Sequence, residues 1–506
     1  MHPPAQIVIF GASGDLTRRM LMPALARLAS RARAEREFSV VGVARRALGD
    51  EAFRGELAKA MPDDARAAFQ KLAPRVFYQA GDVSDAASLA ALRARLDALA
   101  GGGPSGRLTY LALKPELFPA AVRGLSQAGL LAMREGEHVA WRRVVIEKPF
   151  GSDLASARRL NEELHEVLRE DQIYRIDHFL GKETVQNLLG FRFHNAIFEP
   201  LWNRHHVELV QISVAERIGV EQGRAAFYEG TGALRDMLQN HMLQVLALVA
   251  MEPPASLEPE AIRSQKVELL RGLHCPEPGE VGADCVRARY GRGLIGDERV
   301  VGYLDEEAVA PDSRTETYVA LRAEIDNWRW SGVPFLLRHG KRLANRFSEV
   351  QVQFRTPPLQ LFNRPDGMEQ AELRRRLRDG SLCQIRPNVL SLAIQPREAI
   401  RLSFGVKQPG SALRMAPATL DFDYREHFGE APAPAYERLL LDALLGDQTL
   451  FLRADEIEAS WRYADEVRAG WEGPHAPPLL EYPAGSWGPP EADALFHGCE
   501  GGWSRG

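Results

Sequence analysis

The segment IVIFGASGDL, residues 7–16, decides how the fold of this chain is interpreted. Its apolar, β-branched run from Ile7 to Phe10 predicts a buried strand, and a helical pattern follows from about Leu16 to Ala29. Glycines in such a strand-to-helix turn let the backbone approach a pyrophosphate closely, and the helix start offers free N–H groups. The candidate cofactor-binding residues in this turn are Gly11, Ser13, Gly14, Asp15 and Leu16. The spacing differs from G-x-G-x-x-G, so an ordinary glycine turn remains the alternative.

Short apolar runs alternate with helical patterns through the first third of the chain. The predicted strands are 38–43, 76–79, 108–113 and 144–146, and the predicted helices are 84–98 and 120–131. Alternation of this kind indicates crossover units and a parallel sheet. We therefore expect an α/β, Rossmann-like, doubly wound dinucleotide-binding domain over residues 1–176.

The pattern changes after about residue 180. Longer strands are predicted at 207–214, 317–325, 350–354, 390–394 and 400–406, with helices at 232–251 and 435–445. Several of these strands alternate apolar and polar residues, as an antiparallel sheet with one covered face does. The expected second domain, residues 177–506, is a large, mainly antiparallel β+α domain.

Composition excludes several classes of protein. The 506 residues are 45% hydrophobic, too apolar for a disordered chain, and the net charge of -5 argues against a generally basic nucleic-acid binder. Cys275, Cys285, Cys383 and Cys499 lack the spacing of a metal or redox motif, so we expect reduced thiols and no metal site. No basic segment precedes the first apolar run, and no run approaches the roughly 20 residues that cross a bilayer. We expect a cytoplasmic protein without nucleic-acid or membrane partners.

The second predicted strand ends in Arg45 and Arg46. NAD-binding chains tend to carry an acidic residue near this point for the ribose hydroxyl. Two arginines instead suit the 2′-phosphate of NADP. The pattern favours NADP and leaves NAD open as a second acceptor; two solvated surface arginines are the alternative.

Three further segments carry ionisable residues in patterns that suit catalysis. If the chain is helical from Asp177, His178 and Lys182 lie one turn apart and suit a phosphate. A predicted helix farther on carries Asp236, Asn240 and His241 in an otherwise apolar pattern, where a structural histidine is the plainer interpretation. Lys148 follows a predicted parallel strand, where such sheets bind ligands, although a surface lysine is the alternative.

Together these motifs closely resemble the glucose-6-phosphate dehydrogenase family. The matching strings are GASGDL at 11–16, EKPFG at 147–151, RIDHFLGKE at 175–183, GALRDMLQNH at 232–241, GVPFLLRHGKRL at 332–343, IQP at 394–396 and WGP at 487–489. They occur in order along nearly the whole chain. The resemblance implies oxidation of glucose 6-phosphate at carbon 1 to the 6-phosphogluconolactone, with NADP as hydride acceptor, at the entry of the pentose phosphate pathway. It also implies a homodimer or homotetramer joined through the β+α domain.

The resemblance assigns roles to individual residues. His241 matches the family's general base, and Asp177 matches the carboxylate that orients the imidazole. His178 and Lys182 match the substrate-phosphate site. The remaining sugar and phosphate contacts match Lys148, Glu216, Asp236, Lys341 and Arg346, and Lys148 is expected between cofactor and substrate.

Two residues depart from the family pattern. Phe179 stands where the family usually has tyrosine, and Met20 stands where a lysine is common. Loss of a phosphate donor and of a positive charge predicts weaker substrate binding or a relaxed demand for the 6-phosphate. Two alternatives therefore remain: a dehydrogenase of a related sugar or sugar phosphate, and a catalytically inactive NADP-binding sensor or scaffold.

Overall fold

The computed structural model describes residues 5–506 except 32–37, 102, 104, 133–140, 221–223, 278, 358–367, 370, 373–374, 377–386, 411–414, 430–432, 474 and 498–500. Contacts along the chain divide it into two units. Unit 1 comprises Met1–Lys182, Pro254–Ser264 and Ala433–Glu458; unit 2 comprises Glu183–Pro253, Gln265–Pro432 and Ala459–Gly506. Cys383 and Cys499 lie outside the described residues, and Cys275 and Cys285 are free thiols.

Unit 1 is built on a seven-stranded sheet with the order β17-β6-β5-β4-β1-β2-β3. Its strands are β1 (Ala5–Phe10), β2 (Phe38–Ala44), β3 (Val76–Ala80), β4 (Arg107–Leu111), β5 (Arg142–Ile146), β6 (Ile173–Ile176) and β17 (Phe451–Leu452). Strands β1 to β6 pair in parallel, and only β17 is antiparallel. Every residue of β1 is buried, as its apolar run predicted. The order 3-2-1-4-5-6 confirms the doubly wound prediction.

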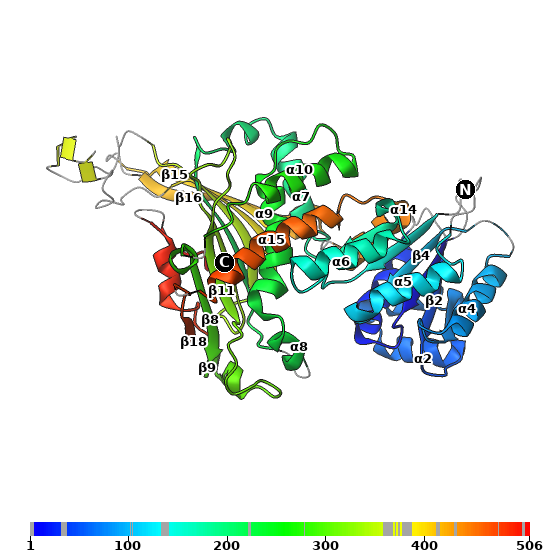
Figure 1. Cartoon of the computed structure of the whole chain (residues 1–506). Helices are drawn as coiled ribbons and strands as arrows, with labels where there is room; N and C mark the ends of the chain where they lie inside the picture. The colour runs from blue at the N-terminus through cyan, green and yellow to red at the C-terminus, as the bar shows by residue number, and fades with distance from the viewer. Residues whose placement is uncertain are drawn as a thin grey trace. The chain divides into compact units, whose positions relative to one another are not determined.

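Helices cover both faces of this sheet, as crossover connections between parallel strands require. The helices of unit 1 are η1 (Thr17–Leu21), α1 (Met22–Ser30), α2 (Asp50–Ala60), α3 (Asp63–Leu72), α4 (Ala86–Leu99), α5 (Phe118–Gln127), α6 (Leu154–His165) and α14 (Ala435–Leu445). Helices α4, α5 and α6 contact one another in sequence and form one layer, which Figure 1 shows beside β4. Helix α1 contacts α3 and α14 in the other layer. Residues 433–458 therefore add the edge strand β17 to the sheet of unit 1 and the helix α14 to one of its two helical layers.

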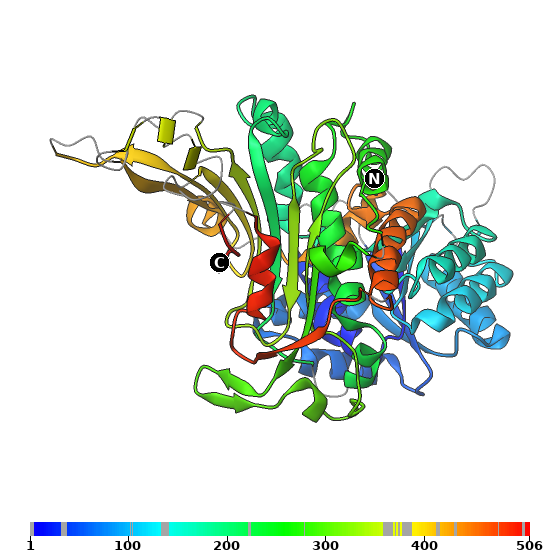
Figure 2. The same ribbon diagram turned by 60° about the vertical axis from the view of Figure 1, so that its left-hand side comes forward.

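Unit 2 is built on a nine-stranded sheet with the order β16-β15-β14-β13-β7-β12-β11-β8-β18. Its strands are β7 (Val207–Ala215), β8 (Cys285–Gly291), β11 (Tyr318–Ala323), β12 (Phe335–Gly340), β13 (Phe347–Phe354), β14 (Val389–Gln395), β15 (Ala399–Lys407), β16 (Met415–Asp423) and β18 (Leu479–Pro483). Among the described strands of this sheet, only the β7–β12 and β8–β18 pairs are parallel, which confirms a mainly antiparallel sheet. Figure 2 shows β15 and β16, yellow to orange, side by side at one edge.

Most helices of unit 2 precede β8 in the chain, and β9 (Gly293–Ile295) and β10 (Glu298–Val300) form a small antiparallel hairpin. The helices are α7 (Glu183–His194), α8 (Ala225–Glu229), η6 (Leu234–Met242), α9 (Leu243–Ala250), α11 (Val281–Asp284) and α13 (Tyr424–Phe428). Two more helices along the chain are α10 (Pro259–Arg271) and α15 (Ala454–Gly470). Every residue of α9 is buried, so this helix forms part of the core. Among the helices of the described ranges, none is both long and apolar enough to cross a membrane.

Candidate active site

The carboxyl ends of the parallel strands in unit 1 carry predicted cofactor-binding residues and Asp177, one of the two predicted catalytic residues. Gly11 follows β1, Arg45 follows β2, and Asp177 follows β6, while Lys148 lies two residues beyond β5. Open α/β sheets bind their ligands outside this edge of the sheet, where the strand order reverses. The sheet therefore brings segments that are distant in sequence to one edge.

Gly11 is required by the backbone at the first of these strand ends. Its φ of +81° is a left-handed conformation, and a Cβ at this position would lie 2.0 Å from the carbonyl oxygen of Ala112. The Gly14 N–H donates to the Gly11 carbonyl at 2.9 Å, which closes the turn. Gly14 and Asp15 are exposed, as is Met20 in η1. A turn this tight and open at its surface fits the predicted pyrophosphate cradle.

The two arginines after β2 have different surroundings. Arg46 forms an ion pair with Glu56 on α2, and its carbonyl accepts a hydrogen bond from the Tyr78 hydroxyl at 2.6 Å. Arg45 is exposed. Hydrogen bonds from Ser84 are the main cause of the lowered pKa of Asp82, and the nearby charge of Arg45 adds to this effect. Arg45 is therefore the arginine better placed to bind an incoming phosphate.

The segment that contains Asp177 and His178 is a turn, so the prediction of a helix from Asp177 is wrong. Asp177 Oδ1 accepts from the Phe179 N–H at 2.9 Å, and α7 begins only at Glu183. An aspartate that caps its own following residues in this way competes with helix formation. His178 and Lys182 are thus neighbours in a turn.

Phe179, which replaces the family's tyrosine, supports Lys182. The Lys182 ammonium lies 4.0 Å from the centre of the Phe179 ring, a cation–π contact. The His178 ring meets the same ring edge-on at 5.2 Å. Phe179 is buried and provides this packing without a hydroxyl donor.

His241 lies on η6, a π-helix that the sequence pattern predicted only as helical. Within this wider helical turn, Asn240 Nδ2 donates a hydrogen bond to the Arg235 carbonyl at 3.0 Å. The neighbouring His241 is fully buried. π-Helical turns are rare and frequently mark functional sites. Asp236, one of the predicted substrate contacts, is half-buried in the first turn of η6.

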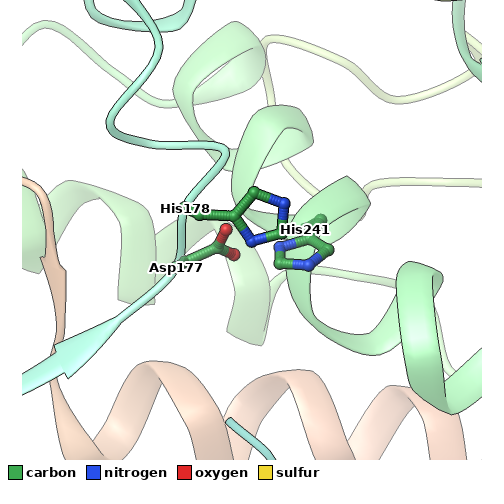
Figure 3. Close-up of side chains that lie close together, drawn as sticks. All are labelled: Asp177, His178 and His241. Carbon is green, nitrogen blue, oxygen red and sulfur yellow. The ribbon is translucent and has the colours of Figure 1, made fainter. Parts of the chain in front are cut away.

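Asp177, His178 and His241 lie close together, as Figure 3 shows. Each offers one nitrogen or oxygen atom, and these atoms all lie within 4.8 Å of one another. A buried carboxylate beside an imidazole fixes its orientation and favours its protonated form. This cluster of two imidazoles and a carboxylate can therefore accept a proton. The same groups can also bind a divalent cation.

A second polar cluster in unit 2 contains other predicted substrate contacts. Lys341 Nζ donates to Glu216 Oε2 at 2.5 Å, next to the end of β12. Burial acts to raise the pKa of Glu216, but Lys341 and His339 bring it below its usual value. Burial also lowers the pKa of His339 to about 4, so this imidazole is neutral at pH 7. Arg346 is exposed in the loop before β13.

Sequence reasoning missed several polar side chains in these surroundings. His339 borders the Glu216–Lys341 pair, and Tyr228 lies under Lys341, whose ammonium is 5.2 Å from the ring centre. The Tyr436 hydroxyl donates a partly buried hydrogen bond to Glu147 in unit 1. Glu147 and His339 lay within quoted motifs but were given no role there, and the sequence pattern gave no signal for Tyr228 or Tyr436. The bond between Lys148 and Pro149, whose isomer the sequence does not give, is cis.

Comparisons with known proteins cover the whole chain. Residues 8–187 match the model described as glucose-6-phosphate dehydrogenase, NAD binding domain, and residues 189–504 match the C-terminal domain of the same enzyme. Curated proteins named glucose-6-phosphate 1-dehydrogenase are similar at full length. The one from Chlamydia pneumoniae is 41% identical over 98% of this chain and 94% of its own length; that from Aggregatibacter actinomycetemcomitans is 42% identical over 99% and 97%.

Solved structures give the same result. A glucose-6-phosphate dehydrogenase in complex with its substrate glucose 6-phosphate superposes with a TM-score of 0.86 at 33% identity, over 100% of this chain and 99% of the other. The glucose-6-phosphate 1-dehydrogenase from Mycobacterium avium gives a TM-score of 0.79 at 38% identity, over 99% of both chains.

Proposed function

This chain belongs to the glucose-6-phosphate dehydrogenase family, and from that premise we propose how its own residues oxidise glucose 6-phosphate at carbon 1 with NADP as acceptor. The observation that carries the proposal is the cluster of His241, Asp177 and His178. A family member that had lost catalysis would be expected to lose its base or the carboxylate first. Both are present and buried.

The cluster supplies proton transfer. Hydride loss from an alcohol becomes easier as its oxygen gains negative charge, so a base must take the carbon-1 hydroxyl proton. In our proposal, His241 takes that proton, while Asp177 orients the ring and stabilises its protonated form. When bound, the nicotinamide of NADP accepts the hydride.

The remaining residues bind and orient the substrate. We assign the phosphate dianion to His178 and Lys182, which share the turn after β6. Glu216 and Asp236 can accept from sugar hydroxyls, while Lys148, Lys341 and Arg346 balance the charge of substrate and cofactor. We also propose that residues 1–176 form the cofactor domain and that 177–506 bind substrate and join subunits into a homodimer or homotetramer in the cytoplasm.

The choice of NADP rests on Arg45. Replacing Arg45 by alanine is expected to raise KM for NADP about tenfold and leave KM for NAD within twofold, because a charge-assisted bond to the 2′-phosphate is lost. Initial rates with each dinucleotide at saturating glucose 6-phosphate measure this. Arg46→Ala is the matched control and should have a smaller effect, since Glu56 already pairs with Arg46. An equal rise for both dinucleotides would contradict the assignment.

Phe179 predicts how tightly the substrate phosphate is bound. Phe179→Tyr is expected to lower KM for glucose 6-phosphate about tenfold, because a hydroxyl donor to a charged group is worth about 1.5–3 kcal/mol. The aromatic ring under Lys182 is kept in this variant. KM for free glucose, which has no phosphate, serves as the internal control. An unchanged KM for glucose 6-phosphate would show that another donor replaces the missing hydroxyl.

One assay separates this function from its alternatives. Initial rates of reduced-dinucleotide formation are measured for glucose 6-phosphate and free glucose, each with NADP and NAD. Preference for glucose 6-phosphate with NADP supports the proposal. Comparable rates with free glucose favour a dehydrogenase with a relaxed phosphate requirement, and stabilisation by NADP without turnover favours a sensor or scaffold.

A further inference from the structure

Glu147 is a partly buried carboxylate next to the active-site lysine, and the proposed function gives it no role. It stands one residue after β5 and directly before Lys148. We propose that Glu147 is a positioning residue for the reaction, which fixes the backbone of Lys148 by gathering three hydrogen-bond donors on its carboxylate. This inference rests on the proposed function, because it assigns Glu147 to the site in which Lys148 acts.

The donors come from three separate parts of unit 1. The Tyr110 hydroxyl, from β4, makes a short hydrogen bond to Glu147 Oε1. The Tyr436 hydroxyl, from the first turn of α14, donates to the same oxygen at 3.1 Å. The backbone N–H of Lys148 is the third donor. The carboxylate therefore ties the Lys148 backbone to a central strand and to a helix from the far end of the sequence.

Charge and burial make this arrangement specific for a carboxylate. Burial raises the pKa of Glu147, but the two phenols, the Lys148 ammonium and the Lys148 N–H all favour the ionised form. Burial and the nearby carboxylates of Glu147 and Asp177 raise the pKa of Tyr436, so this phenol keeps its proton and remains a donor. A glutamine could accept from the phenols, but its amide would lack the charge that holds Lys148.

A purely structural role for Glu147 makes a different prediction. If the Glu147 carboxylate only held α14 against the sheet, its loss would lower the free energy of unfolding. It would then change kcat by the same factor whether residue 148 is lysine or glutamine. If it acts through Lys148, the effect on catalysis must depend on the lysine. A double-mutant cycle distinguishes the two roles, because residues that act together are not additive.

The experiment measures kcat for Glu147→Gln, Lys148→Gln and the double variant, with glucose 6-phosphate and NADP. We expect Glu147→Gln to lower kcat about tenfold in the wild-type background, since small misplacements of a positioned group are costly in rate. In the Lys148→Gln background the same change should lower kcat less than twofold. Additive effects in the two backgrounds would overturn the proposal.

Glu437→Gln is the matched control for lost buried charge. Glu437 is the residue after Tyr436 on α14, is 1% exposed, and pairs with Arg31 at 2.7 Å. We expect it to lower the melting temperature while kcat stays within twofold of wild type; a tenfold loss of kcat here would also contradict a specific role for Glu147. If Glu147→Gln does not fold, Tyr436→Phe in the same cycle removes one donor instead. Wild-type protein without any glucose 6-phosphate turnover would refute the proposed function itself.

Discussion

Replacing His241 by asparagine is expected to lower kcat about 10³-fold while KM for glucose 6-phosphate changes less than threefold. General-base catalysis contributes roughly 10²–10⁴-fold, and an amide of similar size cannot accept the hydroxyl proton. His241 is fully buried on η6, so its imidazole has a fixed position from which to act. Steady-state kinetics at saturating NADP, with circular dichroism to confirm folding, provide the measurement.

His178→Asn is the matched control for this variant because it removes the other imidazole of the same cluster. We assign His178 to the substrate phosphate, so its loss should raise KM far more than it lowers kcat. The assignment of the base would be wrong if the two substitutions had the opposite pattern, with kcat lost at position 178 and KM raised at position 241.

Asp177→Asn carries the second largest expected effect, a loss of about 10²-fold in kcat with a displaced pH profile. An asparagine oxygen can still accept from the Phe179 N–H, so the turn after β6 is kept while the negative charge is removed. A neighbouring carboxylate raises the pKa of an imidazole, and its loss lowers that pKa. The acid limb of kcat/KM, which rises as the base loses its proton, should therefore move to lower pH.

The direction in which the acid limb of kcat/KM moves distinguishes a lost charge from a loosened fold. A variant that only loosened the fold would lose activity at every pH without moving the limb. Profiles of kcat/KM from pH 5 to 9 for wild type and Asp177→Asn compare the two cases. A limb that stays in place, or moves to higher pH, would contradict the pairing of Asp177 with His241.

The sheet of unit 1 could be predicted because most residues of its strands are buried and apolar. β1 is one continuous apolar run, and the helix–strand alternation predicted β2 to β5 to within a few residues. β6 and β17 were not recognised as strands, since they have only 4 and 2 residues. In unit 2, β16 escaped detection because most of its side chains are partly or fully exposed and give no apolar period.

The chemistry of the site could be predicted, but its local geometry could not. The family resemblance named His241, Asp177 and Lys182 as site residues, whereas the turn at 177–182 depends on a hydrogen bond that the Phe179 N–H donates to the Asp177 carboxylate, which competes with a helix. The π-helical turn at His241 left no trace in the apolar pattern. One partner of Glu147, Tyr436, comes from a position 289 residues away in the sequence, so no local pattern could indicate it.

Transfer of deuterium from carbon 1 of the substrate to the dinucleotide is the sharpest test of the proposed hydride transfer. Glucose 6-phosphate deuterated at carbon 1 is incubated with the protein and NADP, and the reduced dinucleotide is examined by mass spectrometry. We expect turnover with one deuterium in each reduced dinucleotide. Turnover that leaves the dinucleotide unlabelled, or no turnover by folded protein that binds NADP, would contradict it.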